Sequence, residues 1–270
     1  MKLLYAKSHW EVFDRPVQEF LSRTKQDGFD GAEMFLPWLK ESPSEIQKLV
    51  SDNGLFLIAQ INSAGKTPQE HLDSFRKNFQ LAVDSGAMMV NSHTGSDVFT
   101  FEQNIAIFEE AIQLSKQAGL TIAHETHRGR PTFSGPATRQ LLEALPELEL
   151  CTDFSHWFCV HESQLHDQED TIKLACERAR HVHARVGFEE GPQIPDPAAP
   201  EWSQIVDRHF ELWQQIIDLS KERGAESLTI TPEFGPPPYM PIEPHTQKPL
   251  ADAWTVNTEF LKVLKQRLKA

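Results

Sequence analysis

The feature that most constrains the fold is a regular alternation of apolar, strand-like runs with helical stretches, repeated eight times. We expect strands at 2–6, 31–36, 55–61, 87–93, 120–125, 148–153, 180–185 and 227–233. Helical patterns lie between them, near 16–27, 43–53, 68–86, 101–118, 135–145, 164–179, 201–223 and 251–268. Eight strand-helix units predict an α/β protein with a closed (β/α)8 barrel. The alternative is a doubly wound open sheet, but no G-x-G-x-x-G motif follows the first strand, which weakens its dinucleotide-binding form.

The length of the chain favours a single domain. Its 270 residues are close to the roughly 250 residues of a typical barrel, and no linker divides them, so we expect one domain over 1–270. Local signals support the boundaries. Thr67 followed by Pro68 is typical of a helix start, and Gly54 and Gly119 each end a helical stretch just before a strand.

Composition excludes several classes of protein. The formal net charge is −13, and such a chain repels phosphate backbones, so we expect no nucleic-acid partner. The apolar part of MKLLYAKSHW is too short for a signal peptide or a membrane span, so this segment is expected to be the first strand. Three cysteines without a CxxC motif indicate a reducing, cytoplasmic setting.

Two connections are long and rich in proline and glycine, namely 186–200 after the seventh strand and 234–250 after the eighth. In a barrel, loops that follow strands lie on the C-terminal face, where active sites are built. Long loops at that face usually shape or cover a site. We therefore expect both segments to border the functional site.

Chemically capable side chains gather where the expected strands end. Side chains alternate along a strand, so Ala123 and Glu125 share one face of their strand, and His181 and His183 share one face of theirs. Other polar residues in or after the expected strands are Glu33, His93, Asp153 and Glu233. If these faces point inward, four consecutive strands bring together Glu125, Asp153, His183 and Glu233. Taken singly, each has an ordinary structural explanation, such as a helix cap for Asp153. Together, three carboxylates and one imidazole suit one divalent metal ion, Mn²⁺, Mg²⁺, Co²⁺ or Zn²⁺, whose charge would offset their burial.

Short motifs in the same order resemble those of a known family. They are GFDGAEMF (28–35), the glutamate of HET (124–126), DFSH (153–156), HVHAR (181–185) and TPEFG (231–235). This series resembles the xylose isomerase-like TIM-barrel superfamily, which includes sugar isomerases, sugar 3-epimerases, inosose dehydratase and the endonuclease IV group. The resemblance implies that Glu125, Asp153, His183 and Glu233 are metal ligands and that His156 contacts the substrate. It also implies that Glu125 and Glu233 act as acid and base.

The expected function is a metal-dependent sugar isomerase or epimerase that moves a proton next to a carbonyl. Its partner would be a small sugar or polyol, and association into a homo-oligomer is compatible with the sequence. We assign Arg185, His127 and His93, with His156, to substrate binding. Four aromatic residues could flank a sugar ring or simply pack in the core: Trp10, Phe154, Trp157 and Phe188.

The sequence departs from the sugar 3-epimerases at one position. They carry an arginine about six residues after the metal-binding histidine of the seventh strand, whereas Arg185 follows His183 by two. The segment GFEEGPQ (187–193) adds two acids near the expected site. These acids would repel a phosphate group, which favours an unphosphorylated substrate.

Three other functions compete with this one. An inosose-type dehydratase would use the same metal site and nearly the same first step. An endonuclease IV-like zinc phosphoesterase is suggested by His93 and by Asp207 with His209. However, the helical pattern over 201–223 places His209 on an apolar stripe and Asp207 away from it. A third possibility is a non-catalytic barrel that binds a ligand, which the intact set of four ligand residues disfavours.

Overall fold

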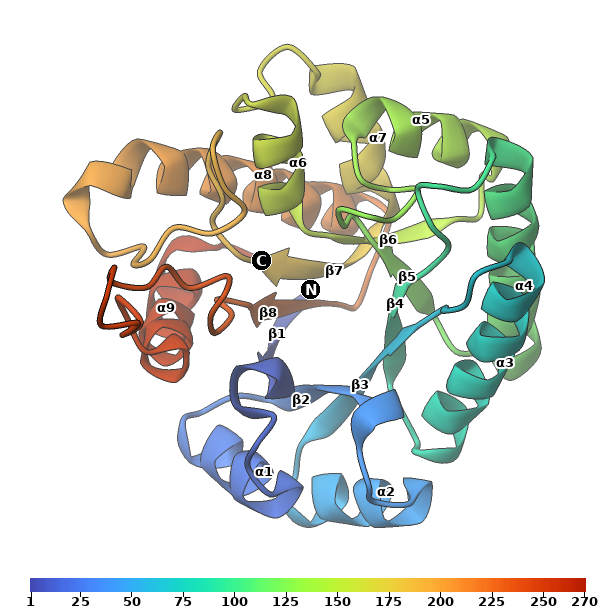
Figure 1. Cartoon of the computed structure of the whole chain (residues 1–270), viewed down its shortest axis with the longest axis horizontal. Helices are drawn as coiled ribbons and strands as arrows, with labels where there is room; N and C mark the ends of the chain where they lie inside the picture. Colours follow the sequence, from blue (N-terminus) through green and yellow to red (C-terminus); the bar gives the residue numbers. More distant parts are fainter.

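The computed structural model describes all residues 1–270, and its eight strands form one closed, parallel barrel in sequential order. Figure 1 shows the strands as an inner ring with the helices around it. The ring closes because β1 pairs with both β2 and β8. The strands are β1 (Lys2–Ser8), β2 (Gly31–Phe35), β3 (Phe56–Asn62), β4 (Met89–His93), β5 (Ile122–Glu125), β6 (Glu149–Thr152), β7 (Ala179–Ala184) and β8 (Ser227–Pro232). The predicted single-domain (β/α)8 barrel is confirmed.

Nine α-helices surround the strands. They are α1 (Val17–Gln26), α2 (Pro43–Asp52), α3 (Pro68–Asp84), α4 (Phe101–Ala118), α5 (Gly135–Ala144), α6 (Phe154–His161), α7 (Glu169–Arg178), α8 (Ser203–Glu222) and α9 (Ala253–Arg267). Thr67 caps α3 as predicted, because its side chain accepts from the backbone N–H of Glu70 while the Glu70 carboxylate accepts from Thr67 N. Such reciprocal bonds fix where the helix begins.

The structure also contains elements that the sequence pattern did not predict. Helix α6 follows β6 directly, and the helix expected over 164–179 begins only at Glu169. The sequence of α6, FSHWFCVH, is apolar around most of its circumference, so it carries no helical periodicity. Three short 3-10 helices are also present: η1 (His9–Val12), η2 (Leu36–Trp38) and η3 (Pro200–Trp202).

The interior of the barrel is layered from apolar to polar. Its lower layer is a small cluster of buried side chains, Ala6, Ile58, Met89, Ala123 and Cys151. Above it, polar side chains point inward from β7 and β8, whose register pairs His181 with Thr229 and His183 with Thr231. The inward faces that alternation predicted for these strands are confirmed. The polar layer carries the candidate site.

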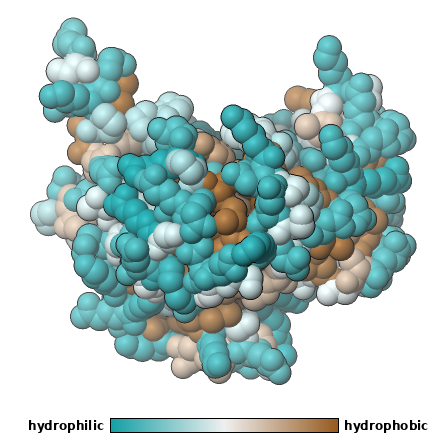
Figure 2. All heavy atoms as spheres, turned by 90° about the horizontal axis from the view of Figure 1, so that it is seen from below, coloured by the Kyte–Doolittle hydropathy of each residue, from teal (hydrophilic) through white to brown (hydrophobic).

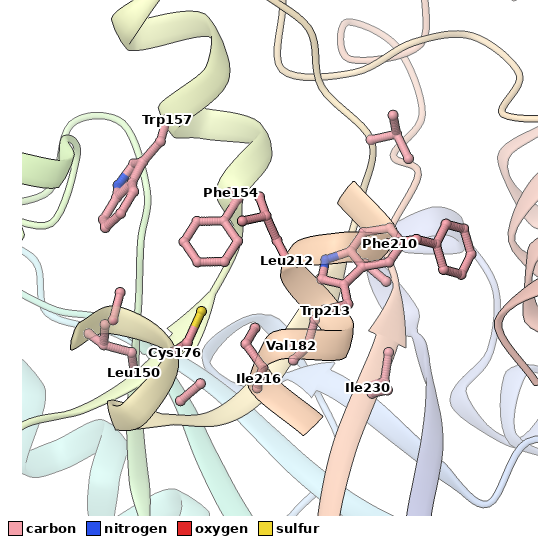
Figure 3. Close-up of a cluster of buried hydrophobic side chains, with 14 of the residues drawn as sticks. Leu150, Phe154, Trp157, Cys176, Val182, Phe210, Leu212, Trp213, Ile216 and Ile230 are labelled. Carbon is pink, nitrogen blue, oxygen red and sulfur yellow. The ribbon is translucent and has the colours of Figure 1, made fainter. Parts of the chain in front are cut away.

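The largest apolar cluster lies outside the barrel, between the strands and the helices. Figure 3 shows part of it, with side chains from β6 to β8 packed against those of α6, α7 and α8. Full burial of a side chain such as Ile216 contributes about 1.5–3 kcal/mol. Phe154 and Trp157 belong to this cluster, so they pack in the core and do not flank the site.

The surface is predominantly polar on the side seen in Figure 2, where small apolar patches are separated by hydrophilic residues. None of the helices has the length and apolar character that crossing a bilayer requires. Helix α8 carries His209 fully buried against Phe158, whereas Asp207 is paired with Arg267 at the surface. The predicted separation of Asp207 from His209 is confirmed.

Candidate active site

Four ligand-type side chains meet at the C-terminal mouth of the barrel. Glu125 ends β5, Asp153 follows β6, His183 lies in β7 and Glu233 follows β8. One donor atom from each of the four lies within 4.8 Å of the others, and all four residues are buried. Neighbouring parallel strands thus present their ends side by side, as the barrel requires. We call these four residues the acid cluster.

A carboxylate from β2 orients the histidine of the acid cluster. Glu33 Oε1 lies 2.9 Å from His183 Nε2, and its Oε2 accepts from the Thr231 hydroxyl and lies 3.1 Å from His181 Nε2. Burial opposes ionisation of Glu33, but the charges of His183 and His181 outweigh it and hold its pKa well below the usual range. Asn91 Nδ2 donates to both Glu33 and Glu125 at 2.9 Å. Glu33 therefore remains a carboxylate that accepts the Nε2 proton of His183.

His183 presents Nδ1 to the acid cluster. Burial opposes protonation of the ring, but the nearby carboxylates of Glu233, Glu33 and Glu125 raise its pKa well above the usual value, so without a metal ion both ring nitrogens carry a proton. Nδ1 lies 2.7 Å from Glu233 Oε2 and 3.6 Å from Glu125 Oε2, yet it makes no hydrogen bond of acceptable geometry. A nitrogen lone pair and a carboxylate oxygen repel each other at such a distance unless a proton or a cation lies between them. Three carboxylates and this nitrogen form a donor set that fits a divalent cation.

Asp153 performs two tasks at once. Its Oδ1 accepts from the backbone N–H of Ser155 at 3.0 Å and so caps α6, while its Oδ2 accepts from Arg185 Nη2 at 2.5 Å. Burial raises the pKa of Asp153, and Arg185 only partly offsets this. Burial likewise raises the pKa of Glu233, with His183 opposing it. A positive charge bound beside these acids would offset the free-energy cost of burying them.

His156 lies behind the cavity surface and is fully buried. Arg128 Nε donates to its Nδ1 at 3.1 Å, and Arg185 Nη2 lies 2.7 Å from its Nε2. Burial, with the charges of His127 and Arg185, lowers the pKa of His156 well below its usual value, so the ring is neutral. The structure thus places His156 where it holds Arg185 against Asp153.

The other two histidines assigned to substrate binding border the cavity. His93 Nε2 lies 2.8 Å from Glu125 Oε2, and the His93 ring is 4.5 Å from that of His127. Burial lowers the pKa of His127 to about 3. His93, Glu125 and His127 also form a second grouping of donor atoms within 4.8 Å, which shares Glu125 with the acid cluster.

The cavity above the acid cluster has a volume of about 280 Å³. Its polar lining comes from β3 to β5, β7 and β8, and its aromatic lining comes from the segments at the ends of β1, β2 and β8. The lining residues are Trp10, Phe13, Phe35, Trp38, Gln60, Asn62, His93, Glu125, His127, Arg130, Arg185, Glu233 and Tyr239. Of the four aromatic residues considered from the sequence, only Trp10 reaches this cavity.

The two long loops are tied together beside the cavity. The side chain of Gln193 donates to the carbonyl of Gly235 at 3.1 Å and accepts from its N–H at 2.7 Å. Tyr239, from the second loop, contacts Arg185, whose guanidinium lies 4.6 Å from the centre of the ring. The second loop therefore borders the cavity through Tyr239, whereas no residue of 186–200 lines the cavity and this first loop contacts the second through Gln193.

Several residues of the site were not assigned from the sequence, among them Glu33, Asn91 and Tyr239. Glu33 lies in the middle of the second expected strand, 31–36, with its side chain facing the interior of the barrel. Its partners come from β4, β7 and β8, so no local pattern could have identified them. Tyr239 lies in an irregular loop whose conformation the sequence does not specify.

The fold and the buried acid cluster define a (β/α)8 barrel with a candidate metal site at its C-terminal mouth. A family model described as xylose isomerase-like TIM barrel matches residues 21–219, and the chain belongs to this family. The resemblance inferred from the motifs is therefore confirmed. A search of curated proteins found no match.

Several solved structures share the fold. A 3-keto-D-glucoside 4-epimerase from E. coli superposes with a TM-score of 0.64, is 12% identical, and covers 98% of this chain and 100% of its own. A D-psicose 3-epimerase gives a TM-score of 0.64 at 11% identity, with 99% and 100% covered. A family 2 AP endonuclease from Brucella melitensis gives 0.63 at 14% identity, with 96% and 98% covered. At these identities the likeness establishes the fold alone.

Proposed function

We propose that this protein is a divalent-metal-dependent sugar isomerase or epimerase. The observation that carries the proposal is the convergence of Glu125, Asp153, His183 and Glu233 within 4.8 Å, with His183 Nδ1 left without a hydrogen bond. These residues would hold the ion. When bound, the ion would polarise a substrate carbonyl and a neighbouring hydroxyl and so acidify the C–H bond between them.

The chain itself offers two groups that could move the proton. Glu125 and Glu233 both line the cavity, and they come from strands on different sides of the barrel mouth. Two carboxylates that approach a substrate from different directions can remove a proton from one face and return it to the other. Arg185 and His127, which also line the cavity, would donate hydrogen bonds to substrate oxygens.

Proton exchange with solvent tests this function directly. A panel of ketoses, aldoses and inososes is incubated in D₂O with the Mn²⁺-loaded protein and followed by NMR. We expect deuterium at the carbon next to the carbonyl, together with isomerised or epimerised product. Glu233→Gln should retain the fold by circular dichroism and lose at least 100-fold in exchange rate. Exchange at the wild-type rate in this variant would contradict the role of Glu233.

Metal content and product identity separate the competing functions. One ion per chain agrees with an isomerase or an epimerase, whereas three zinc ions would indicate a phosphoesterase that also uses His93, Glu125 and His127. Elimination of water from an inosose, with no epimerised product, would identify a dehydratase. No binding of Mn²⁺, Mg²⁺, Co²⁺ or Zn²⁺ by calorimetry would refute the metal site.

A further inference from the structure

Three aromatic side chains form a platform at the rim of the cavity, outside the acid cluster. Phe13, Phe35 and Trp38 all line the cavity. The Trp38 ring centre lies 4.9 Å from that of Phe35 and 5.3 Å from that of Phe13. Trp38 is nevertheless 70% exposed, and it is the only tryptophan among the exposed large apolar residues. We call these three residues the aromatic rim.

The backbone that carries Trp38 is fixed by contacts on both sides. Trp38 ends η2, which follows β2 directly, and Pro37 occupies the first turn of this short helix. Leu36 is buried in the core beneath it, and the N–H of Leu39 donates to the Leu36 carbonyl at 3.0 Å. The ring itself packs against Phe13 and Phe35 at the edge of the cavity. A contiguous apolar patch of this kind beside a cavity is typical of a ligand-binding groove, whereas a single exposed apolar side chain would not be.

The aromatic and polar parts of the cavity lie on different sectors of the barrel. The aromatic side chains come from the segments at the ends of β8, β1 and β2, which are neighbours in the ring. Trp10 and Tyr239 lie beside the aromatic rim, with ring centres 5.0 Å apart. The polar side chains come mainly from β3, β4, β5 and β7. A ligand that reaches both sectors needs a polar, reacting end and a flat apolar end.

We propose that the aromatic rim is a subsite for a second ring, so that the substrate is a glycoside whose ketone-bearing sugar reacts at the acid cluster. This inference rests on the proposed function and adds the substrate class. Tryptophan faces bind the C–H face of a sugar or an aromatic ring, and no charged residue of the rim would select an ionic group. A second copy of the chain is a poorer fit, because a stable interface needs about 800 Å² per partner.

Binding measurements test the subsite without relying on turnover. The probes are 3-keto-D-glucose, its methyl β-glycoside, its phenyl β-glycoside and cellobiose oxidised to the same ketone on its non-reducing ring. Each is titrated by calorimetry into Mn²⁺-loaded wild type, Trp38→Ala, Trp38→Phe and Phe101→Ala. Phe101 is the matched control, since it is also an exposed aromatic residue (40%) but does not line the cavity.

We expect the phenyl glycoside or the disaccharide to bind wild type about tenfold more tightly than the methyl glycoside. Trp38→Ala should abolish this difference, Trp38→Phe should retain most of it, and Phe101→Ala should leave it unchanged. Whichever two-ring probe binds more tightly identifies the second ring as aromatic or as a sugar. Equal affinity for the methyl and two-ring ligands in wild type, no binding of any probe, or a difference that survives Trp38→Ala would overturn the proposal.

Two further results keep this inference separate from the proposed function. If the two-ring preference depends on Trp38 while no deuterium exchange occurs, the subsite stands and the isomerase function falls. If Trp38→Ala instead changes the sedimentation coefficient of the protein, the rim is an interface between copies and the subsite is wrong. Exchange on free ketoses with no preference for two rings supports the isomerase and rejects the glycoside.

Discussion

At the scale of single residues, Asp153 both caps a helix and faces the candidate metal site. Its two oxygens face different partners, because Oδ1 caps α6 through Ser155 while Oδ2 faces Arg185 and the acid cluster. The sequence presents the cap and the metal ligand as alternative explanations; the structure shows the cap, and the ligand role stays a prediction. A cap at this position fixes the side-chain rotamer, so the oxygen that faces the cluster is held in place.

Two substitutions at Asp153 separate the cap from the charge. Asparagine caps a helix as well as aspartate does, so Asp153→Asn should keep the free energy of unfolding of the metal-free protein within about 1 kcal/mol of wild type. It should weaken Mn²⁺ binding at least tenfold, because one ligand charge is lost. Asp153→Ala should lose both the metal affinity and about 1 kcal/mol more of stability. Denaturant unfolding and calorimetry give the two quantities; equal Mn²⁺ affinity in Asp153→Asn and wild type would remove Asp153 from the metal site.

Glu33→Gln tests the orientation of His183. Glutamine retains the shape but no longer accepts the His183 proton as a charged group, so the ring loses its fixed tautomer. Removal of such an outer partner typically reduces metal affinity by 10–100-fold. Metal titration of Glu33→Gln measures this, with the exposed Glu45→Gln as control. An affinity within twofold of wild type would mean that Glu33 is only a core hydrogen-bond acceptor.

The convergence of the acid cluster could be predicted from the sequence, whereas the residues that support it could not. Glu125, His183 and Glu233 each occupy a strand end whose inward face follows from alternation along the strand. Glu33 is recognisable only through its bonds to residues 58 to 198 positions away. Such contacts depend on the barrel register, which no local signal contains. The roles of His93, His127, His156 and Arg185 in substrate binding stay predictions.

At the scale of elements, the strands and most helices follow from periodicity, and α6 does not. Its Phe154 and Trp157 pack into the core while His156 faces the arginines, so nearly every side of this short helix is buried. A helix buried all round shows no amphipathic period. The sequence therefore could not distinguish 154–161 from an irregular connection, and the position of His156 followed only from the structure.

Gly235, which follows β8, lies directly against Trp10, a lining residue in the connection after β1. A Cβ atom at Gly235 would lie 2.0 Å from the Trp10 ring, so Gly235→Ala must displace that ring. We expect a loss of about 1–3 kcal/mol in stability and a higher KM. Gly224→Ala is a control for a general loss of stability away from the cavity, since its Cβ would meet nothing within 4 Å but its φ of +77° strains the backbone. A KM that rises equally in both variants would show that lower stability, and not displacement of Trp10, is responsible.

Helix α8 contributes a pH-dependent term to stability through His209. Burial lowers the pKa of His209 to about 4, against 6.5 for an exposed histidine. Below pH 6.5 the unfolded chain binds a proton there that the folded chain does not, so stability falls with pH until about pH 4, by about 3 kcal/mol. His209→Gln removes this dependence and retains a donor for the Gly187 carbonyl.

Denaturant unfolding at pH 7 and pH 4 measures the effect. The loss of stability on acidification should be about 3 kcal/mol smaller in His209→Gln than in wild type. His166→Gln, at an exposed histidine, should behave as wild type does. An identical loss in His209→Gln and wild type would mean that His209 is protonated in the folded protein.

At the scale of the whole molecule, the barrel concentrates buried negative charge at one end. Glu33, Glu125, Asp153 and Glu233 are buried together there, with Arg185 as the buried guanidinium of the group. The fold tolerates this because the surrounding apolar cluster of 35 buried residues supplies the stability. If the proposed metal site is correct, a bound cation should therefore stabilise this end of the molecule.

Thermal unfolding therefore should respond to metal. A ligand present at 100 times its Kd stabilises the folded state by about 2.7 kcal/mol, which for a chain of this size raises Tm by about 5–10 °C. We expect this rise when Mn²⁺ is added to EDTA-treated protein, and its reversal by further EDTA. Glu233→Gln should show a smaller rise and a higher Tm than wild type in EDTA, because one buried charge has been neutralised. A wild-type Tm that is the same in Mn²⁺ and in EDTA would contradict a metal site in the acid cluster.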